Sequence, residues 1–255
     1  MTSVRFPGKV LKKINGKEIL KIIIERLNHS KNIDKIVVAT TKNKKDDKIV
    51  SLLKKMNIPY YRGSTKNVLS RIINCAEKNK IENILRVTAD NPLTDYILAD
   101  KMINYYKKYD KYDYLTNNYF ADKASRKIAY GLDLSLFSLK SLLRVKNFAK
   151  KNKFFLEYPT LYYYTKGKSK FKIKNINHSK KLIIDETFRL TVDTLPDLKL
   201  FQKLFNLYFK TFKKDKYLYL SKLRVLLNYN PSLKKINQDI VHYKPYLKFL
   251  KKKSA

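Results

Sequence analysis

The sequence predicts an α/β protein with a mostly parallel β-sheet that is covered by helices on both faces. Segments with helical apolar spacing alternate with short β-branched runs along the first half of the chain. Several of these runs are unbroken apolar stretches, which is typical of strands buried on both sides of a parallel sheet. With 255 residues, 44% of them hydrophobic, the chain is long enough for one domain, or for one domain with an appendage.

The first half alternates regularly between helices and strands. Apolar residues at helical spacing between Lys17 and Ser30 predict a helix, and the run DKIVVATT at Asp34 to Thr41 predicts a buried strand. The elements predicted next are a helix at 46–56, a strand at 58–61, a helix at 66–78, a strand at 84–89, a helix at 95–109 and a strand at 112–117.

The second half is less regular. The elements predicted there are a strand at 132–137, a helix at 139–150, strands near 171–176 and 188–192, and a helix at 196–212. The tail at 217–252 predicts two or three short helices, broken at Asn230-Pro231 and Lys244-Pro245. We therefore expect one domain at 1–212 and a helical extension at 213–255.

Composition excludes several classes of protein. One cysteine cannot form an internal disulfide, and three scattered histidines give no zinc-ligand spacing. No apolar run approaches the roughly 20 residues that span a bilayer, and the amino end lacks a signal-peptide core. We expect a soluble protein of a reducing cytoplasm.

The net charge of +36, from 57 Lys and Arg against 21 Asp and Glu, would suit nucleic acid or an anionic membrane surface. However, lysine-rich stretches at 42–45, 150–153, 213–216 and 251–253 are scattered along the whole chain. A diffuse basic surface is the favoured interpretation, and a dedicated nucleic-acid stripe is the weaker alternative.

Two acidic residues stand out in a chain with few acids. Asp90 in LRVTADNP and Asp193 in LTVDTLP each follow a β-rich run, and each is followed within three residues by a proline. Ligands of open parallel sheets bind beyond the carboxyl ends of the strands, where both acids would lie. Helix capping is the alternative for each acid taken alone. Together they favour a shared divalent cation such as Mg²⁺.

Two further segments could bind phosphate or a nucleotide. In Arg5-Phe6-Pro7-Gly8-Lys9 a turn brings backbone close to a ligand, and its two cationic residues could neutralise a polyphosphate. In YRGSTKNVLSR, at 61–71, a helix begins after Gly63-Ser64, with Asn67 and Arg71 one turn apart. Capping by Ser64 or Thr65 is the alternative there.

Six motifs in order carry a family resemblance: RFPGKVLKKINGKEIL, DKIVVATT, RGSTKNVLSR, ILRVTADNPLTD, GLDLSLFS and RLTVDTLPDL. The chain resembles a cytidylyltransferase of the spore coat polysaccharide biosynthesis type, related to the 3-deoxy-manno-octulosonate and acylneuraminate cytidylyltransferases. The resemblance runs from the first residues to about Lys210.

The resemblance implies a Rossmann-like nucleotide-sugar transferase fold that activates an acidic sugar with CTP and releases pyrophosphate. It assigns Arg5 and Lys9 to the triphosphate, Asp90 and Asp193 to Mg²⁺, and Ser64 and Arg71 to the nucleotide. The sugar hydroxyl would attack the α-phosphorus in line, with charge neutralisation as the main catalytic effect.

The sequence departs from the family pattern in three places. Family members have a strand ahead of the Arg-x-Pro-Gly-Lys stretch, and Met1 stands inside that loop, so we expect the first, central strand to be missing. Asn67 stands where the family usually has Asp, and Tyr158 follows Glu157 where it has His.

The implied partners are CTP and an acidic sugar, and a homodimer is compatible with the family. Two alternative functions remain: a catalytically impaired truncated homologue, and a basic nucleic-acid-binding protein on the same fold. Mg²⁺-dependent and CTP-dependent pyrophosphate release separates the enzyme from both alternatives.

Overall fold

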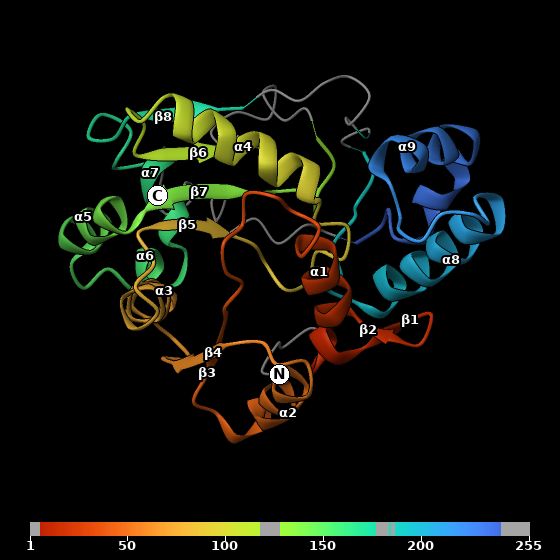
Figure 1. The fold of residues 1–255 in the computed structure, drawn as a ribbon, viewed down its shortest axis with the longest axis horizontal. Coiled ribbons are helices and arrows are strands. Elements are labelled where there is room, and N and C mark those ends of the chain that lie inside the picture. Colours follow the sequence, from red (N-terminus) through yellow and green to blue (C-terminus); the bar gives the residue numbers. More distant parts are fainter. Residues whose placement is uncertain (1–5, 118–127, 177–183, 185–186, 241–255) are drawn as a thin grey trace.

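The computed structural model of the chain describes residues 6–117, 128–176, 184 and 187–240 (Figure 1). Its α-helices are α1 (Ile19–Leu27), α2 (Asp47–Lys55), α3 (Val68–Lys78), α4 (Tyr96–Lys108), α5 (Leu139–Ala149), α6 (Lys153–Glu157), α7 (Pro159–Tyr164), α8 (Leu195–Thr211) and α9 (Leu220–Tyr229). Short 3₁₀ turns are η1 (Lys9–Leu11), η2 (Lys44–Asp46) and η5 (Pro231–Ile236). The strands are β1 (Lys13–Ile14), β2 (Lys17–Glu18), β3 (Val38–Thr41), β4 (Tyr60–Gly63), β5 (Asn83–Arg86), β6 (Tyr114–Thr116), β7 (Ser135–Ser138) and β8 (Ile173–Asn175).

The described strands form three separate sheets. β1 and β2 make a small antiparallel hairpin, and β3 pairs with β4 in parallel. The largest sheet has the order β5-β7-β6-β8, in which β7 runs antiparallel to both neighbours and β6 pairs with β8 in parallel. The predicted α/β class is confirmed, with a mixed rather than a mostly parallel main sheet. Two parallel neighbouring strands need a long crossover, usually a helix, between them. The sequence predicts no helix between β6 and β7, which agrees with their antiparallel pairing.

The segment at 188–192 is not a strand, contrary to the prediction. It makes one isolated bridge, between Tyr130 and Arg189. Its backbone N–H groups go to two different segments, because the Leu190 N–H bonds to the Tyr130 carbonyl at 2.7 Å and the Val192 N–H bonds to the Asp90 carbonyl at 2.8 Å. No single partner strand is therefore available to make a ladder with it.

The boundaries of several other elements differ from the predicted ones. The helix predicted from Lys17 begins at Ile19, because 17–18 pair as β2. Only part of each strand predicted at 34–41 and 84–89 is paired, as β3 and β5. Helices α6 and α7 were not predicted; their aromatic residues pack into a second core with α3 and α5.

The tail joins the main core. The predicted break at Asn230-Pro231 is confirmed, since α9 ends at Tyr229 and η5 begins at Pro231. Leu218, Leu223 and Leu233 lie buried in one cluster with residues of α1, α4 and α8. The second break, at Lys244-Pro245, lies outside the described residues, and the boundary after residue 212 stays a prediction.

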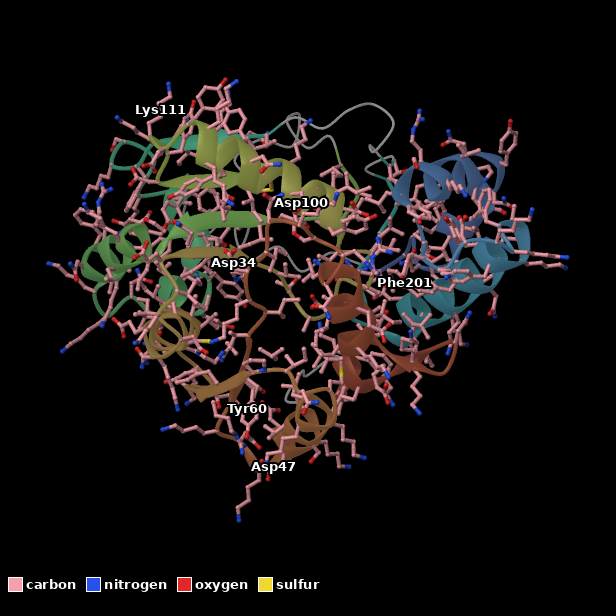
Figure 2. All side chains as sticks on the ribbon, viewed as in Figure 1. Asp34, Asp47, Tyr60, Asp100, Lys111 and Phe201 are labelled. Carbon is pink, nitrogen blue, oxygen red and sulfur yellow. The ribbon has the colours of Figure 1, made fainter. Side chains whose placement is uncertain are left out.

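Figure 2 shows side chains with nitrogen tips at many points around the outline of the described part, in keeping with the diffuse charge expected from the sequence. None of the described helices is long and apolar enough to cross a membrane.

Gly131 fixes the approach of one loop to the 188–192 segment. Its φ is +99°, and a Cβ placed on it would lie 1.6 Å from the Leu190 carbonyl oxygen. Gly16 also has a positive φ, +80°, but a Cβ there would meet nothing within 4 Å. Another residue at Gly16 would meet only backbone strain, whereas another residue at Gly131 would meet both strain and a clash with the Leu190 carbonyl.

We predict that Gly131→Ala lowers the free energy of unfolding by about 3 kcal/mol or more, because strain and a backbone clash add. Gly16→Ala, the matched control, should cost about 1 kcal/mol from strain alone. Urea unfolding of both variants measures the difference. Equal losses would contradict the close contact between Gly131 and Leu190.

Candidate active site

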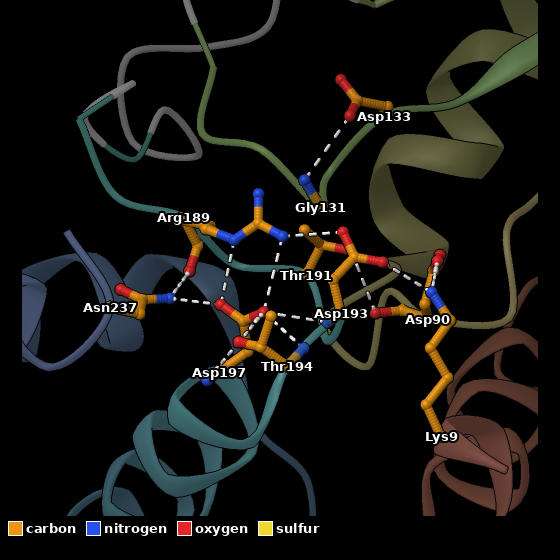
Figure 3. A network of polar contacts seen from close by, with 10 residues as sticks. All are labelled: Lys9, Asp90, Gly131, Asp133, Arg189, Thr191, Asp193, Thr194, Asp197 and Asn237. Atoms are coloured by element: carbon orange, nitrogen blue, oxygen red, sulfur yellow. Dashed lines mark hydrogen bonds and ion pairs between the residues drawn. The ribbon is translucent and has the colours of Figure 1, made fainter. Parts of the chain in front are cut away.

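The Lys9 ammonium joins two carboxylates that are far apart in the sequence. Its Nζ lies 2.5 Å from Asp90 Oδ2 and 2.7 Å from Asp193 Oδ1 (Figure 3). The three side chains are largely buried, with 15%, 24% and 13% of their surface exposed. Burial by itself lowers the pKa of Lys9, but attraction to Asp90 and hydrogen bonds to both carboxylates outweigh it, so that the pKa of Lys9 is raised.

Each acid is placed by the backbone that precedes it. Asp90 follows β5, and its carbonyl accepts the Val192 N–H, which ties the exit of β5 to the segment that carries Asp193. Neither acid caps a helix: the N-cap of α4 is Asp95 and the N-cap of α8 is Thr194. The capping alternative is therefore wrong for both Asp90 and Asp193.

A second, fully buried carboxylate orients Asp193. Asp197, with no exposed surface, accepts hydrogen bonds through Oδ2 from the backbone N–H groups of Asp193 and Thr194, both at 2.9 Å. Its Oδ1 accepts from Arg189 Nε at 2.9 Å and from Asn237 Nδ2 at 2.8 Å. Arg189 also donates to Asp193 Oδ2 at 2.7 Å. This network holds one Asp193 oxygen, and the other faces Lys9 (Figure 3).

The helix-start segment is arranged differently from expectation. Asn67, not Ser64 or Thr65, caps α3, accepting the Ser70 N–H at 2.8 Å. Ser64 instead holds Arg71, whose Nη1 donates to the Ser64 carbonyl at 2.6 Å. Burial, followed by the nearby Arg86 charge, lowers the pKa of Arg71, and its buried Nε has no hydrogen-bond partner among the described residues.

One cavity of about 980 Å³ connects part of these segments. Lys9, Asp90 and Arg71 all line it, together with residues of α1, β3 and β5. Ser64 and Asp193 do not line it, although Ser64 contacts Arg71 and Asp193 contacts Lys9. Arg5 lies outside the described residues.

The donor set suits a magnesium ion. Two carboxylates converge on one cationic group, and Mg²⁺ binds through one or two carboxylates and completes its shell with water and phosphate oxygens. In the described part of the chain, no group of three or more His, Cys, Asp or Glu side chains could hold a metal on its own. A metal here would thus complete its shell with water and with oxygens of a bound substrate.

The sequence pattern did not single out Arg189, Asp197 or Asn237. The first two stand in RLTVDTLPDL, and Thr194 to Asp197 has the spacing of a capping box, which the structure contains. That signal could have identified Asp197. Nothing in the sequence around Asn237 indicates that it reaches the α8 N-terminus, because only tertiary packing of η5 brings it there.

We predict that Asp197→Asn destabilises the protein by about 3 to 5 kcal/mol, because it removes the fully buried carboxylate partner of the Arg189 guanidinium and leaves it, among the described carboxylates, only Asp193. Glu25→Gln removes the exposed partner of Lys17 and should cost less than about 1 kcal/mol. Denaturant unfolding measures both. If Asp197→Asn lowers the free energy of unfolding no more than Glu25→Gln does, the stabilising role of the Asp197 network is contradicted.

Comparison with known proteins shows the family. A family model described as cytidylyltransferase matches residues 1–235. A cytidylyltransferase structure from Leptospira borgpetersenii superposes with a TM-score of 0.81 at 27% identity, covering 95% of this chain and 94% of that one. An uncharacterized protein of Methanocaldococcus jannaschii is 34% identical over 93% of this chain and 91% of its own length.

Two relatives match over shorter stretches. The spore coat polysaccharide biosynthesis protein SpsF of Bacillus subtilis is 34% identical over 46% of this chain and 51% of its own length. The 8-amino-3,8-dideoxy-manno-octulosonate cytidylyltransferase of Shewanella frigidimarina is 30% identical over 42% of this chain and 44% of its own. The match to the family model spans most of the sequence and includes every described residue of the Lys9, Asp90 and Asp193 cluster, so this chain belongs to the cytidylyltransferase family, whose members are CTP-dependent nucleotidyltransferases.

Proposed function

We propose that this protein transfers a cytidylyl group from CTP to a hydroxyl of an acidic sugar, giving a CMP-sugar for a surface polysaccharide or glycan. The observation that carries the proposal is the Lys9 ammonium held between Asp90 and Asp193. Such a cluster offers both a cation for phosphate oxygens and carboxylates for a metal.

The relatives support the sugar class. One is named for an octulosonate, which is an acidic sugar, and another for spore coat polysaccharide. The basic surface is compatible with two anionic substrates, because a positive potential raises their local concentration.

In the proposed reaction the sugar oxygen forms a bond to the α-phosphorus of CTP, and the bond to the bridging oxygen of pyrophosphate breaks. The sugar hydroxyl proton leaves to solvent. Lys9 exchanges its carboxylate partners for triphosphate oxygens, and Asp90 and Asp193 are the residues that would hold Mg²⁺. When bound, the metal supplies charge neutralisation for the phosphoryl oxygens.

The Asp197 network has a positioning role in this scheme. Asp193 keeps its orientation because Arg189 holds one oxygen and Asp197 holds the backbone N–H. Arg71 contributes a second cationic group from α3 in the same cavity, and the Ser64 carbonyl limits its motion. We propose that Ser64 and Arg71 bind the nucleotide through this guanidinium.

We predict that Asp90→Asn and Asp193→Asn each lower kcat/KM by about 100-fold or more, because a lost charge-stabilising group costs that order in catalysis. The assay is pyrophosphate release from CTP and Mg²⁺ with 3-deoxy-manno-octulosonate or N-acetylneuraminate as acceptor. Asp47→Asn, at an exposed pair with Arg62, is the matched control and should keep full activity.

Two results would count against the proposal in different ways. Full activity in both cluster variants would remove the assigned roles of Asp90 and Asp193. Activity only with neutral sugars would keep the cytidylyltransferase reaction and remove the acidic-sugar class.

We predict that Lys9→Ala weakens CTP binding by about 1.5 to 3 kcal/mol, the value of a charge-assisted hydrogen bond. The same change removes the cation that Asp90 and Asp193 share and leaves, among the described cationic groups, only Arg189 beside Asp193, so Mg²⁺ alone should raise the melting temperature of the variant more than that of the unaltered protein. Lys13→Ala, at a side chain that is 61% exposed, is the control. Unchanged CTP affinity would exclude Lys9 from the triphosphate site, and an equal Mg²⁺ effect would exclude metal binding by the two acids.

A further inference from the structure

Arg86, the last residue of β5, is a charged side chain without a counter-ion. Within the part of the chain that the structure describes, it makes no hydrogen bond and no ion pair. Arg26, Arg144 and Arg189, by contrast, each bind a carboxylate, at N–O distances of 2.6 to 3.1 Å. An arginine does not lose its proton in a protein. The charge of Arg86 therefore has to be balanced by something other than these residues.

The surroundings of Arg86 make this charge costly. The side chain is partly buried and lines the same cavity as Lys9 and Asp90. Burial lowers the pKa of Arg86, and attraction to neighbouring groups that include Asp90 offsets this only in part. The Asp90 carboxylate is itself bound to Lys9, at 2.5 Å. An unpaired charge that opens onto a cavity is typical of a group that binds a ligand.

The pleat of β5 directs Arg86 toward α3. Ile84 and Arg86 are two positions apart, so they point to the same face of the sheet. Ile84 packs against a cluster that contains Leu69 and Ile73 of α3, the helix that lies below β5 in Figure 1. Arg86 therefore shares this face with the first turn of α3, in which Arg71 stands.

Arg71 and Arg86 act on one another. After burial, the charge of Arg86 is the next cause of the lowered pKa of Arg71. The Ser64 carbonyl holds one end of the Arg71 guanidinium, at 2.6 Å, and no described carboxylate binds the rest of it. Both arginines line the one cavity. Two like charges that repel one another are stabilised together by an anion that both contact.

The tyrosines around Arg86 do not supply that anion. The Tyr114 hydroxyl is hydrogen-bonded to Ser135 Oγ, at 2.7 Å, and to the Tyr164 hydroxyl. Burial raises the pKa of Tyr114 and of Tyr164, so both phenols stay neutral near neutral pH. They form a polar wall beside the guanidinium, and the negative charge has to come from a bound molecule.

We propose that Arg71 and Arg86 together bind one oxyanion of a substrate, either a phosphoryl group of the nucleotide or the carboxylate of the acidic acceptor. The inference rests on the proposed function and adds a second anion site to it, beside the Lys9 cluster. A planar guanidinium binds either group through two parallel N–H···O bonds. The phosphoryl group is the expected source, because Arg71 is already proposed to bind the nucleotide.

The test measures substrate binding to the full chain by calorimetry, with CTP and 3-deoxy-manno-octulosonate titrated separately. Arg86→Met should weaken the binding of one of them about tenfold or more, and the expected one is CTP. Weaker binding of the octulosonate alone would support the site and assign the carboxylate to it. Unchanged binding of both would overturn the proposal.

Arg224→Met is the matched control. Arg224, on α9, is also partly buried and has no described hydrogen bond or ion pair, but it does not line the cavity. Its loss removes the same charge and should change both affinities by less than about twofold, since only the diffuse field of the protein is altered. An equal effect of the two substitutions would overturn a specific contact at Arg86.

The melting temperature without ligand separates a binding group from a structural one. Arg86→Met should not lower it, because the change removes an unpaired charge, whereas CTP should raise it less than in the unaltered protein. A clear fall in the ligand-free protein would overturn the proposal. Arg86→Lys keeps the charge and loses the planar fork, so it should fold normally and still bind the same substrate more weakly.

A double-mutant cycle tests whether the two arginines share one anion. If they do, Arg71→Met and Arg86→Met combined should weaken binding by less than the product of the two single effects. Independent effects would overturn the sharing. Binding is measured without turnover, so an absence of pyrophosphate release with every acidic sugar would count against the proposed function alone. Unchanged binding in an active enzyme would remove only the Arg86 site.

Discussion

The buried carboxylate of Asp197 is the constraint on which the site depends. A charge with no exposed surface is stable only when donors surround it, and here those donors are the backbone of Asp193 and Thr194 and the side chains of Arg189 and Asn237. Satisfying Asp197 starts α8, fixes the tail through η5 and sets the orientation of Asp193. The need to hydrogen-bond one buried carboxylate thus fixes both the packing of the tail and the orientation of Asp193.

The Lys9 bridge has a different character. Its partners lie 81 and 184 positions away in the sequence, and its raised pKa reflects two carboxylates that would repel one another without it. In the proposed reaction this ammonium exchanges its carboxylate partners for phosphate oxygens. Under that proposal, the contacts that stabilise the described site are also the ones that a nucleotide and a metal would replace.

The cavity links this site to the rest of the sheet. Asp90 ends the lining stretch that continues beyond β5, and Lys9 and Val10 line the cavity from the amino-terminal loop.

The sequence by itself determined the element types, the order of helices and strands in the first half, and the pair Asp90 and Asp193, because apolar periodicity and strand-end acids are local patterns. It also indicated Lys9 as a phosphate-binding residue through its turn. Only the tertiary structure decided that 188–192 shares its N–H groups between two segments, that β7 runs antiparallel, and that Arg189 and Asn237 converge on Asp197. These features are long-range pairings, set by which segments pack together, and no local pattern encodes them.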